Sequence, residues 1–425
     1  MKAVALVPGS TTVRIVDRPE PSITAADEVK IRVRRVGICG TDREQASGGR
    51  ARAPDGRDEL VIGHEMLGEV VEVGDDVTRV QPGDHAVLTV RRGCGRCLPC
   101  GMNRSDMCRT GGYRERGIWG EDGFLADYVV DREAHVVRVP PEVEAIGVLT
   151  EPLSVVEKAI DEAVRIQFTR LPAAGATPDW LFGRRCLIAG LGPVGLLAAL
   201  ILRLRGAEVC GMDVVDPASA RPRWLEGIGG RYVDGREFPP DRLREETGPM
   251  DLLFEAAGAP RLAFNLLELL GLNGIYIVTG IPGGDRDLPI PAAQLLRDLV
   301  LDNQLMMGSV NAARGHFQLA VDDLVCAYDR WGEHVARLIT HRYSPEEIGR
   351  ALHEHPEDEI KAVVEWGEER FVHAPEPATA TWTRNRGQRW ASRSVGGGGR
   401  SPRATSPGGA TARSRRWRAT RRSAS

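Results

Sequence analysis

Lysine and aromatic residues are scarce in this chain. Only four of its 56 basic residues are lysine, and aromatic residues make up 5% of its 425 residues. Aliphatic side chains must therefore fill most of any core, and a hydrophobic content of 42% is enough to build one. The scarcity of lysine is typical of proteins from salt-rich surroundings or from GC-rich genomes, and the composition does not choose between the two.

Long hydrophobic runs are also lacking. No extended apolar run follows Met1, which argues against a signal peptide. The longest uncharged apolar stretch, between Arg185 and Arg203, is short for a membrane span, and a glycine-rich turn and a proline interrupt it. We therefore expect a soluble cytoplasmic protein with no membrane partner. In that compartment cysteines are more often metal ligands than disulfides.

Acidic residues are missing from the C-terminal segment. From Pro377 onward the chain has twelve arginines but no Asp, Glu or Lys, so the rest of the chain carries a net charge of -15. An acidic body argues against nucleic-acid binding by the folded part. The segment 374–425 is rich in Gly, Ser, Thr and Pro, and we expect it to be disordered. It is either a basic binding arm or a non-native extension, and arginine without lysine favours the extension.

The hydrophobic pattern changes near Glu151. Before it, short alternating segments such as 29–34, 67–74 and 86–88 predict a β-rich, barrel-like domain. After it, strands and helices alternate, which predicts a parallel, doubly wound sheet. The predicted helices and strands of this second part are 152–166, 186–190, 193–205, 208–213, 252–256, 275–279 and 314–329.

Four cysteines are spaced as C-x2-C-x2-C-x7-C. Such short gaps let the thiolates converge on one tetrahedral ion, and four ligands leave no open position for chemistry. A structural zinc ion is the favoured interpretation, and an iron–sulfur cluster is the alternative. The four residues are Cys94, Cys97, Cys100 and Cys108.

A second candidate metal site combines three types of ligand. Cys39 lies in Gly-Ile-Cys-Gly-Thr-Asp, and His64 and Glu65 lie in Gly-His-Glu. Taken singly, each is more often an ordinary buried residue, but together they suit an open zinc site. Glu151 can supply a fourth ligand or hold a zinc-bound water. Such a zinc ion lowers the pKa of a bound alcohol, so that hydride can leave for a cofactor.

A dinucleotide site is predicted by a glycine-rich turn. The motif G-x-G-x-x-G follows an apolar strand and opens an apolar helix, which is the context that the motif requires. Asp213 ends the next strand, where its carboxylate can bind the ribose hydroxyls and repel a 2′-phosphate. We therefore favour NAD over NADP. The motif residues are Gly190, Leu191, Gly192, Pro193, Val194 and Gly195.

In this order, these motifs resemble those of the medium-chain zinc alcohol dehydrogenases, over about residues 1–370. Within that family, local runs such as Gly40–Glu44, Leu149–Lys158 and Gly308–Asn311 are most similar to the archaeal-type glucose 1-dehydrogenases. The resemblance implies an α/β fold with a GroES-like β-barrel catalytic domain and a Rossmann domain. The predicted boundaries are 1–155 for the catalytic domain with its cysteine lobe at about 92–110, 156–304 for the Rossmann domain, 305–373 for a return to the catalytic domain, and 374–425 for the tail.

The resemblance also implies roles for individual residues. Cys39, His64 and Glu65 would hold the catalytic zinc, with Glu151 beside it as a ligand and substrate contact. Thr41, Glu115 and Asn311 would bind sugar hydroxyls. The residues near the nicotinamide would be Thr279, Gly280, Ile281, Ser309, Val310 and Asn311.

Two departures from the family pattern bear on these roles. Val90 stands where some relatives carry Asn, so one sugar contact is in doubt. Val214 and Val215 stand where some carry arginine, which puts the usual dual use of NAD and NADP in doubt.

The hypothesis is an NAD(P)-dependent glucose 1-dehydrogenase that uses two zinc ions per chain and forms a homo-oligomer, a dimer or a tetramer. It would oxidise D-glucose, and other aldoses such as galactose, to the lactone. The alternatives are a zinc dehydrogenase acting on a polyol or on threonine, and a dinucleotide-binding protein without catalysis.

Overall fold

The structure is a computed structural model that describes residues 1–171, 180–237, 240–283 and 287–367. The chain divides into a compact unit, 1–373, and the segment 374–425. The predicted basic tail, 374–425, lies outside the described residues.

The N-terminal part is built on antiparallel strands. Its largest sheet has the order β11-β6-β5-β3-β19-β18, with β10 also paired to β3. Three strands predicted from alternation are confirmed as β3 (Glu28–Ile38), β5 (Glu65–Val73) and β6 (His85–Leu88). The apolar side chains of Val29, Ile31 and Val33 are fully buried, as a half-buried strand requires.

Smaller elements complete this part. They are β1 (Lys2–Leu6), β2 (Val13–Asp17), α1 (Gly40–Ala46), β4 (Leu60–Val61), β7 (Arg91–Arg92), α2 (Leu98–Gly101), η1 (Ser105–Met107), β8 (Arg114–Arg116), β9 (Gly120–Glu121), β10 (Tyr128–Arg132), η2 (Glu133–His135), β11 (Val136–Val139) and η3 (Pro141–Leu149).

A parallel six-stranded sheet follows the long helix α3 (Thr150–Arg170). Its order is β14-β13-β12-β15-β16-β17, so the chain moves outward from β12 to β14 and then returns to the other side of β12. Ligands of such sheets bind at the carboxyl ends of the strands where the order reverses, here β12 and β15.

The segments predicted at 186–190, 193–205, 208–213, 252–256 and 275–279 are confirmed, and the other elements of this part were not predicted. The elements are β12 (Arg185–Ala189), α4 (Pro193–Leu204), β13 (Glu208–Asp213), α5 (Ala220–Gly227), β14 (Arg231–Asp234), α6 (Pro240–Thr247), β15 (Met250–Glu255), α7 (Pro260–Asn265), η5 (Leu266–Leu269), β16 (Leu270–Val278), α8 (Ala292–Leu301) and β17 (Leu305–Gly308).

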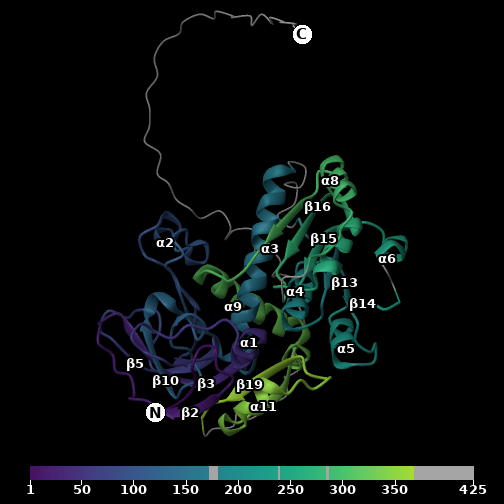
Figure 1. Cartoon of the computed structure of the whole chain (residues 1–425). Helices are drawn as coiled ribbons and strands as arrows, with labels where there is room; N and C mark the ends of the chain where they lie inside the picture. The colour runs from purple at the N-terminus through teal and green to yellow at the C-terminus, as the bar shows by residue number, and fades with distance from the viewer. Residues whose placement is uncertain (172–179, 238–239, 284–286, 368–425) are drawn as a thin grey trace, which may run out of the picture. The chain divides into compact units, whose positions relative to one another are not determined.

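The chain then returns to the N-terminal sheet. The connection contains α9 (Arg314–Trp331), α10 (Glu333–Ala336), β18 (Ile339–Tyr343), η6 (Pro345–Glu347), α11 (Ile348–His353) and β19 (Lys361–Glu365). Strand β19 pairs antiparallel with β3, so the yellow-green end of the described chain lies beside one of its first, purple strands (Figure 1). This pairing brings Lys361 next to the residues that follow β3.

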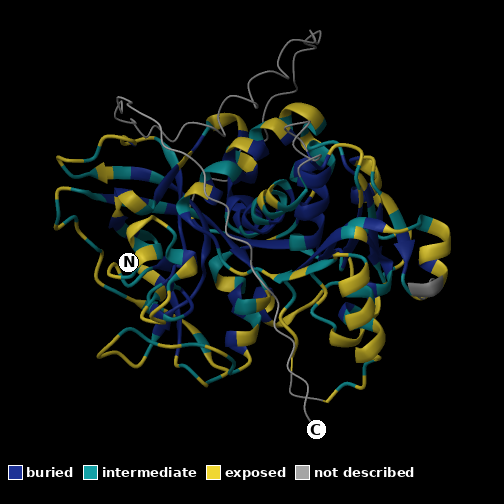
Figure 2. Cartoon of the chain, turned by 90° about the horizontal axis from the view of Figure 1, so that it is seen from above, coloured by how far each residue is buried: buried dark blue, intermediate teal, exposed yellow. Residues whose placement is uncertain are grey.

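Buried residues are concentrated in the strands and in the central helices, whereas many loops are exposed (Figure 2). The longest uncharged apolar stretch, between Arg185 and Arg203, was compared with a membrane span in the sequence. It forms β12, the glycine turn and α4. Within the described residues, no helix is both long and apolar enough to cross a membrane.

Candidate active site and metal centres

The glycine-rich turn has the geometry that its sequence predicts. Gly190 has a φ of +90°, and a Cβ there would lie 2.8 Å from the Ala257 nitrogen. A Cβ on Gly195 would lie 1.8 Å from the Gly190 oxygen, whereas one on Gly192 would meet nothing within 4 Å. The first glycine therefore allows the tight turn, and the third allows close packing of the helix against the strand. The second leaves the backbone open to a ligand.

Asp213 ends β13 next to this turn. One oxygen of its carboxylate accepts a hydrogen bond of 2.7 Å from the Leu191 amide, and the other accepts one of 2.7 Å from the Val214 amide. Arg221 Nη1 on α5 lies 3.8 Å from Asp213 Oδ2. The predicted ribose-binding carboxylate thus has a guanidinium nearby, although Val214 and Val215 carry no charge.

Cys39, His64 and Glu65 converge on one point. Their ligand atoms all lie within 4.8 Å of one another, and Cys39 Sγ is 3.1 Å from His64 Nε2. Cys39 follows β3, and Glu65 opens β5, where it lies opposite Gly37 in the sheet register. A Cβ at Gly37 would lie 2.0 Å from Glu65 Oε2. A thiolate, an imidazole and a carboxylate so arranged form a donor set that fits zinc.

A buried carboxylate orients the imidazole of this group. Asp42 Oδ1 lies 3.2 Å from His64 Nδ1, and Asp42 Oδ2 accepts a hydrogen bond of 2.9 Å from the Cys39 amide. Burial would lower the pKa of His64, but the charges on Cys39 and Asp42 raise it well above its usual value. A carboxylate at this position favours a proton on Nδ1, which would leave Nε2 to bind a metal ion. Asp42 lies in the Gly-Ile-Cys-Gly-Thr-Asp motif, but nothing in the sequence pattern predicts its contact with His64.

Lys361 balances the carboxylate of the group. Its ammonium contacts Glu65 Oε2 and donates a hydrogen bond of 2.9 Å to the Ile38 carbonyl, and the lysine is 1% exposed. Burial would lower the pKa of Lys361, but Glu65 and Cys39 raise it. No local signal in the sequence identified this residue, because it is almost 300 residues from Glu65.

Glu151 and Thr41 lie near the group without belonging to it. The three converging ligand atoms do not include the Glu151 carboxylate, which stands at the start of α3. Burial raises the pKa of Glu151 to about 7, with opposing contributions from His64 and Glu65. The Thr41 amide donates to Cys39 Sγ at 3.2 Å.

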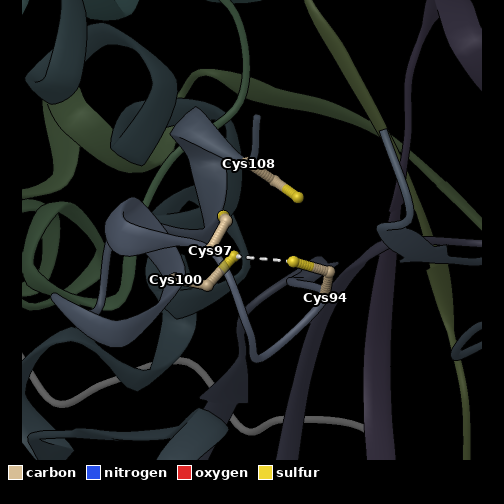
Figure 3. A group of neighbouring side chains, drawn as sticks. All are labelled: Cys94, Cys97, Cys100 and Cys108. Atoms are coloured by element: carbon tan, nitrogen blue, oxygen red, sulfur yellow. Dashed lines mark hydrogen bonds between the residues drawn. The ribbon is translucent and has the colours of Figure 1, made fainter. Parts of the chain in front are cut away.

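The four cysteines of the lobe also converge. All four sulfur atoms lie within 4.8 Å of one another and face a common space (Figure 3), and Cys94 Sγ is 3.9 Å from Cys100 Sγ. Hydrogen bonding from Thr110 lowers the pKa of Cys94 to about 5, whereas burial and the neighbouring Cys97 raise the pKa of Cys100 to about 12. Neighbouring thiolates repel one another, and a bound cation would remove that repulsion.

The predicted sugar contacts Glu115 and Asn311 touch each other. Asn311 Nδ2 donates a hydrogen bond of 2.7 Å to Glu115 Oε1. Two arginines hold the same carboxylate: Arg91 Nη2 lies 2.8 Å from Oε1, and Arg50 Nη2 lies 2.8 Å from Oε2. Burial would raise the pKa of Glu115, but Arg91 and Arg50 lower it, so the group is an ionised acceptor. Neither arginine was predicted from the sequence to be a partner of Glu115.

The remaining predicted cofactor positions lie at the ends of the parallel strands. Thr279 follows β16 and donates from Oγ1 to the Glu255 carbonyl at 2.8 Å, and a Cβ at Gly280 would lie 2.3 Å from the Gly258 nitrogen. Ile281 is 80% exposed. Ser309 follows β17, and its buried hydroxyl has no hydrogen-bond partner among the described residues, which suits a site for a polar ligand.

Val90 is 2% exposed, so it offers neither a polar group nor an open surface to a substrate. This agrees with the departure seen in the sequence.

Three features of this chain define the zinc-containing, medium-chain class of dehydrogenases. They are a parallel nucleotide-binding sheet, an antiparallel barrel-type domain and a Cys-His-Glu group. Comparison with family models agrees with this class. A model of the alcohol dehydrogenase GroES-like domain matches residues 25–141. A model of the glucose dehydrogenase C-terminus matches residues 144–366.

Individual relatives narrow the class. The chain is 39% identical to the glucose 1-dehydrogenase of Methanocella arvoryzae, over 86% of this chain and 100% of that protein. It is 38% identical to glucose 1-dehydrogenase 2 of Vulcanisaeta moutnovskia, over 86% of this chain and 99% of that protein.

A solved structure is similar over the same length. The glucose dehydrogenase of Haloferax mediterranei, in complex with NADP, zinc and gluconolactone, superposes with a TM-score of 0.77 at 29% identity, covering 87% of this chain and 100% of that one. The chain belongs to the glucose 1-dehydrogenase family of zinc-containing alcohol dehydrogenases.

Proposed function

We propose that this protein is a glucose 1-dehydrogenase that oxidises D-glucose, and other aldoses such as galactose, to the 1,5-lactone. The C1 hydrogen leaves as hydride to NAD(P)+, and the hydroxyl proton passes to solvent. The observation that carries the proposal is the ionised Glu115 carboxylate, which accepts a hydrogen bond of 2.7 Å from Asn311. The same chain brings Cys39, His64 and Glu65 together. A polyhydroxy substrate needs such fixed acceptors and donors.

The residues have separate duties in this proposal. Cys39, His64 and Glu65 hold a zinc ion, which, when bound, supplies the Lewis acidity that lowers the pKa of the substrate hydroxyl. Glu151 lies beside it, as a ligand or a substrate contact. Thr41, Glu115 and Asn311 hold the other sugar hydroxyls. The glycine turn holds the pyrophosphate at the N-terminus of α4, and residues 279–281 and 309–311 lie along the nicotinamide half.

The substrate is tested by initial rates with glucose, galactose, xylose, sorbitol and threonine, each with NAD and NADP. Reduction of the cofactor with at least one aldose is expected. Activity with sorbitol or threonine but with no aldose would establish the polyol or amino-alcohol alternative. Cofactor binding with no turnover on any of the five would favour a protein without catalysis.

The sugar contacts carry a separate prediction. Changing Asn311→Ala, or Glu115→Gln, which keeps the shape of the side chain, is expected to raise the KM for glucose roughly tenfold or more, because a hydrogen bond to a charged group contributes about 1.5–3 kcal/mol. Steady-state kinetics with glucose measures this. Gln318→Ala is a control that should leave the KM unchanged, because Gln318 is half-buried on α9 and donates its side-chain hydrogen bond to Asp322 of the same helix. An unchanged KM in both site variants would remove these residues from the sugar site.

We further infer two zinc ions per chain and a preference for NAD. The preference is supported by the Asp213 carboxylate at the end of β13, and Arg221, 3.8 Å away, leaves some affinity for a 2′-phosphate. The cytoplasmic location and a dimeric or tetrameric state stay predictions. The domain boundaries at 155, 304 and 373 also stay predictions.

The cofactor preference is tested by Arg221→Ala and Asp213→Asn. The first is expected to lower kcat/KM for NADP about tenfold while kcat/KM for NAD changes little, because only NADP carries a phosphate for the guanidinium to bind. The second removes the charge that repels that phosphate and is expected to shift the ratio toward NADP. Equal losses for both cofactors in Arg221→Ala would contradict the assignment.

A further inference from the structure

Lysine is rare in this chain, and two of its four lysines are buried. Lys361 is 1% exposed and contacts Glu65, as described above. Lys158 is 2% exposed and has no role in the proposed function so far. It lies on α3, seven residues after Glu151, and two turns of helix separate residues on the same face. A buried ammonium requires partners, because an unpaired one would be costly.

The Lys158 ammonium contacts two oxygen atoms. It donates a hydrogen bond of 2.8 Å to the Val310 carbonyl, and it lies 3.2 Å from Asp106 Oδ2. Asp106 lies in η1 within the cysteine lobe, and its side chain is fully buried. Lys158 therefore joins three segments that are distant in sequence: α3, the cysteine lobe and the loop after β17.

Both of these contacts lead to the same carboxylate. Val310 precedes Asn311, which donates to Glu115 Oε1 at 2.7 Å. The Asp106 carbonyl accepts a hydrogen bond of 3.0 Å from Arg91 Nη1, and Arg91 Nη2 donates to Glu115 Oε1 at 2.8 Å. The contacts form a closed ring, which we call the Lys158 ring: Lys158, Asp106, Arg91, Glu115, Asn311 and Val310.

The backbone of the loop explains why the ring needs a fixed donor. Asn311 has a φ of +62°, in the left-handed region that non-glycine residues seldom adopt. Asparagine adopts this region more readily than most residues, and the Asn311 side chain also accepts a hydrogen bond of 2.9 Å from the Ala312 amide. The Lys158 hydrogen bond to the preceding carbonyl is a second contact that fixes this loop. A lysine suits the place because its ammonium is compact and its donors do not lie in one plane, whereas those of a guanidinium do.

We propose that Lys158 is a positioning residue for substrate recognition: through Val310 and Asp106 it sets the relative placement of Asn311 and Glu115, and so decides which pattern of sugar hydroxyls is accepted. The inference rests on the proposed function. It assigns no chemical step to Lys158, which touches neither the sugar nor the metal ligands.

The test compares sugars that differ by one hydroxyl. Lys158→Met keeps the length of the side chain and removes the donor. Its kcat/KM for glucose is expected to fall about tenfold or more, and the preference for glucose over galactose and 2-deoxyglucose is expected to fall by a similar factor. General damage to the structure would lower kcat/KM for all sugars alike and leave their ratios unchanged. Adding Lys158→Met to Glu115→Gln should cost little more, because both changes act on one network.

Arg165→Gln is the matched control. Arg165 lies two turns further along α3 and contacts Asp161 of the same helix at 2.7 Å, outside the Lys158 ring. Its sugar preference should equal that of the unmodified protein. If Lys158→Met does not fold, Asp106→Asn, which keeps the shape of its side chain, decides the matter with the same sugar ratios.

The two ways of failing are distinguishable. This inference alone would be overturned if a folded Lys158→Met oxidised aldoses with unchanged ratios of kcat/KM between the sugars. If Lys158→Met does not fold, the same result in Asp106→Asn would overturn it. Absence of aldose oxidation in the unmodified protein would overturn the proposed function and this inference with it.

Discussion

Changing Cys39→Ser is expected to lower kcat for glucose by at least about a thousandfold, because a Lewis acid at the reacting oxygen contributes several kcal/mol and each 1.36 kcal/mol is tenfold in rate. The variant should also bind one zinc ion fewer than the unmodified protein. Serine is a sharper test than alanine. Cys39 is the N-cap of α1 and accepts from the Thr41 amide, and a serine hydroxyl can still make that hydrogen bond.

Metal analysis of the purified variant, together with kcat, checks this prediction. Cys326→Ala is the control, since Cys326 is an exposed cysteine on α9 that belongs to neither candidate metal group. It should keep both the metal content and the rate. A Cys39→Ser protein with full zinc content and more than a tenth of the original kcat would remove Cys39 from the catalytic site.

Loss of one cysteine from the lobe should lower the thermal stability of the protein. Cys100→Ala is expected to remove the other zinc ion and to lower the melting temperature by roughly 10 °C, because the binding energy of a structural zinc ion, of order 10 kcal/mol in small domains, contributes to folding. Cys100 suits the test because its sulfur is one of the four that converge, 3.9 Å from Cys94 Sγ (Figure 3). The zinc at Cys39, His64 and Glu65 should remain.

Thermal unfolding and metal content of Cys100→Ala measure this effect, again beside Cys326→Ala. An unchanged melting temperature and two zinc ions per chain would show that the lobe holds no metal. Iron and sulfide in the unmodified protein would instead establish the iron–sulfur alternative.

The parts that the sequence predicted correctly share a physical reason. The glycine turn, the strand before it and the helix after it are local, so the pattern of residues 186–205 contains all the information that decides their structure. The four cysteines are equally local, since spacings of two residues bring thiolates together in any compact turn. Element ends shifted by a few residues, as with α3, which spans Thr150–Arg170 where 152–166 was predicted.

The parts that the sequence analysis missed depend on distant segments. Asp42 lies close to Cys39 in sequence, but its contact with His64 requires the pairing of β3 with β5. Lys361 reaches Glu65 only because β19 returns to pair with β3. Arg91 is placed on Glu115 by the register of β7 and β8, and no periodicity in the sequence indicates that pairing.

The sequence by itself determined the chemistry of this protein: which residues can ligate metal, where a pyrophosphate can approach the backbone, and to which family the chain belongs. Only the tertiary structure decided what holds those residues in place. Asp42 contacts His64, and Lys361 contacts Glu65. In the Lys158 ring, Lys158 and Glu115 are buried charged groups. In each case the partner is distant in the sequence. A buried charge is stable only where the fold brings its partner to it, and that pairing is a property of three-dimensional contact that short-range patterns do not encode.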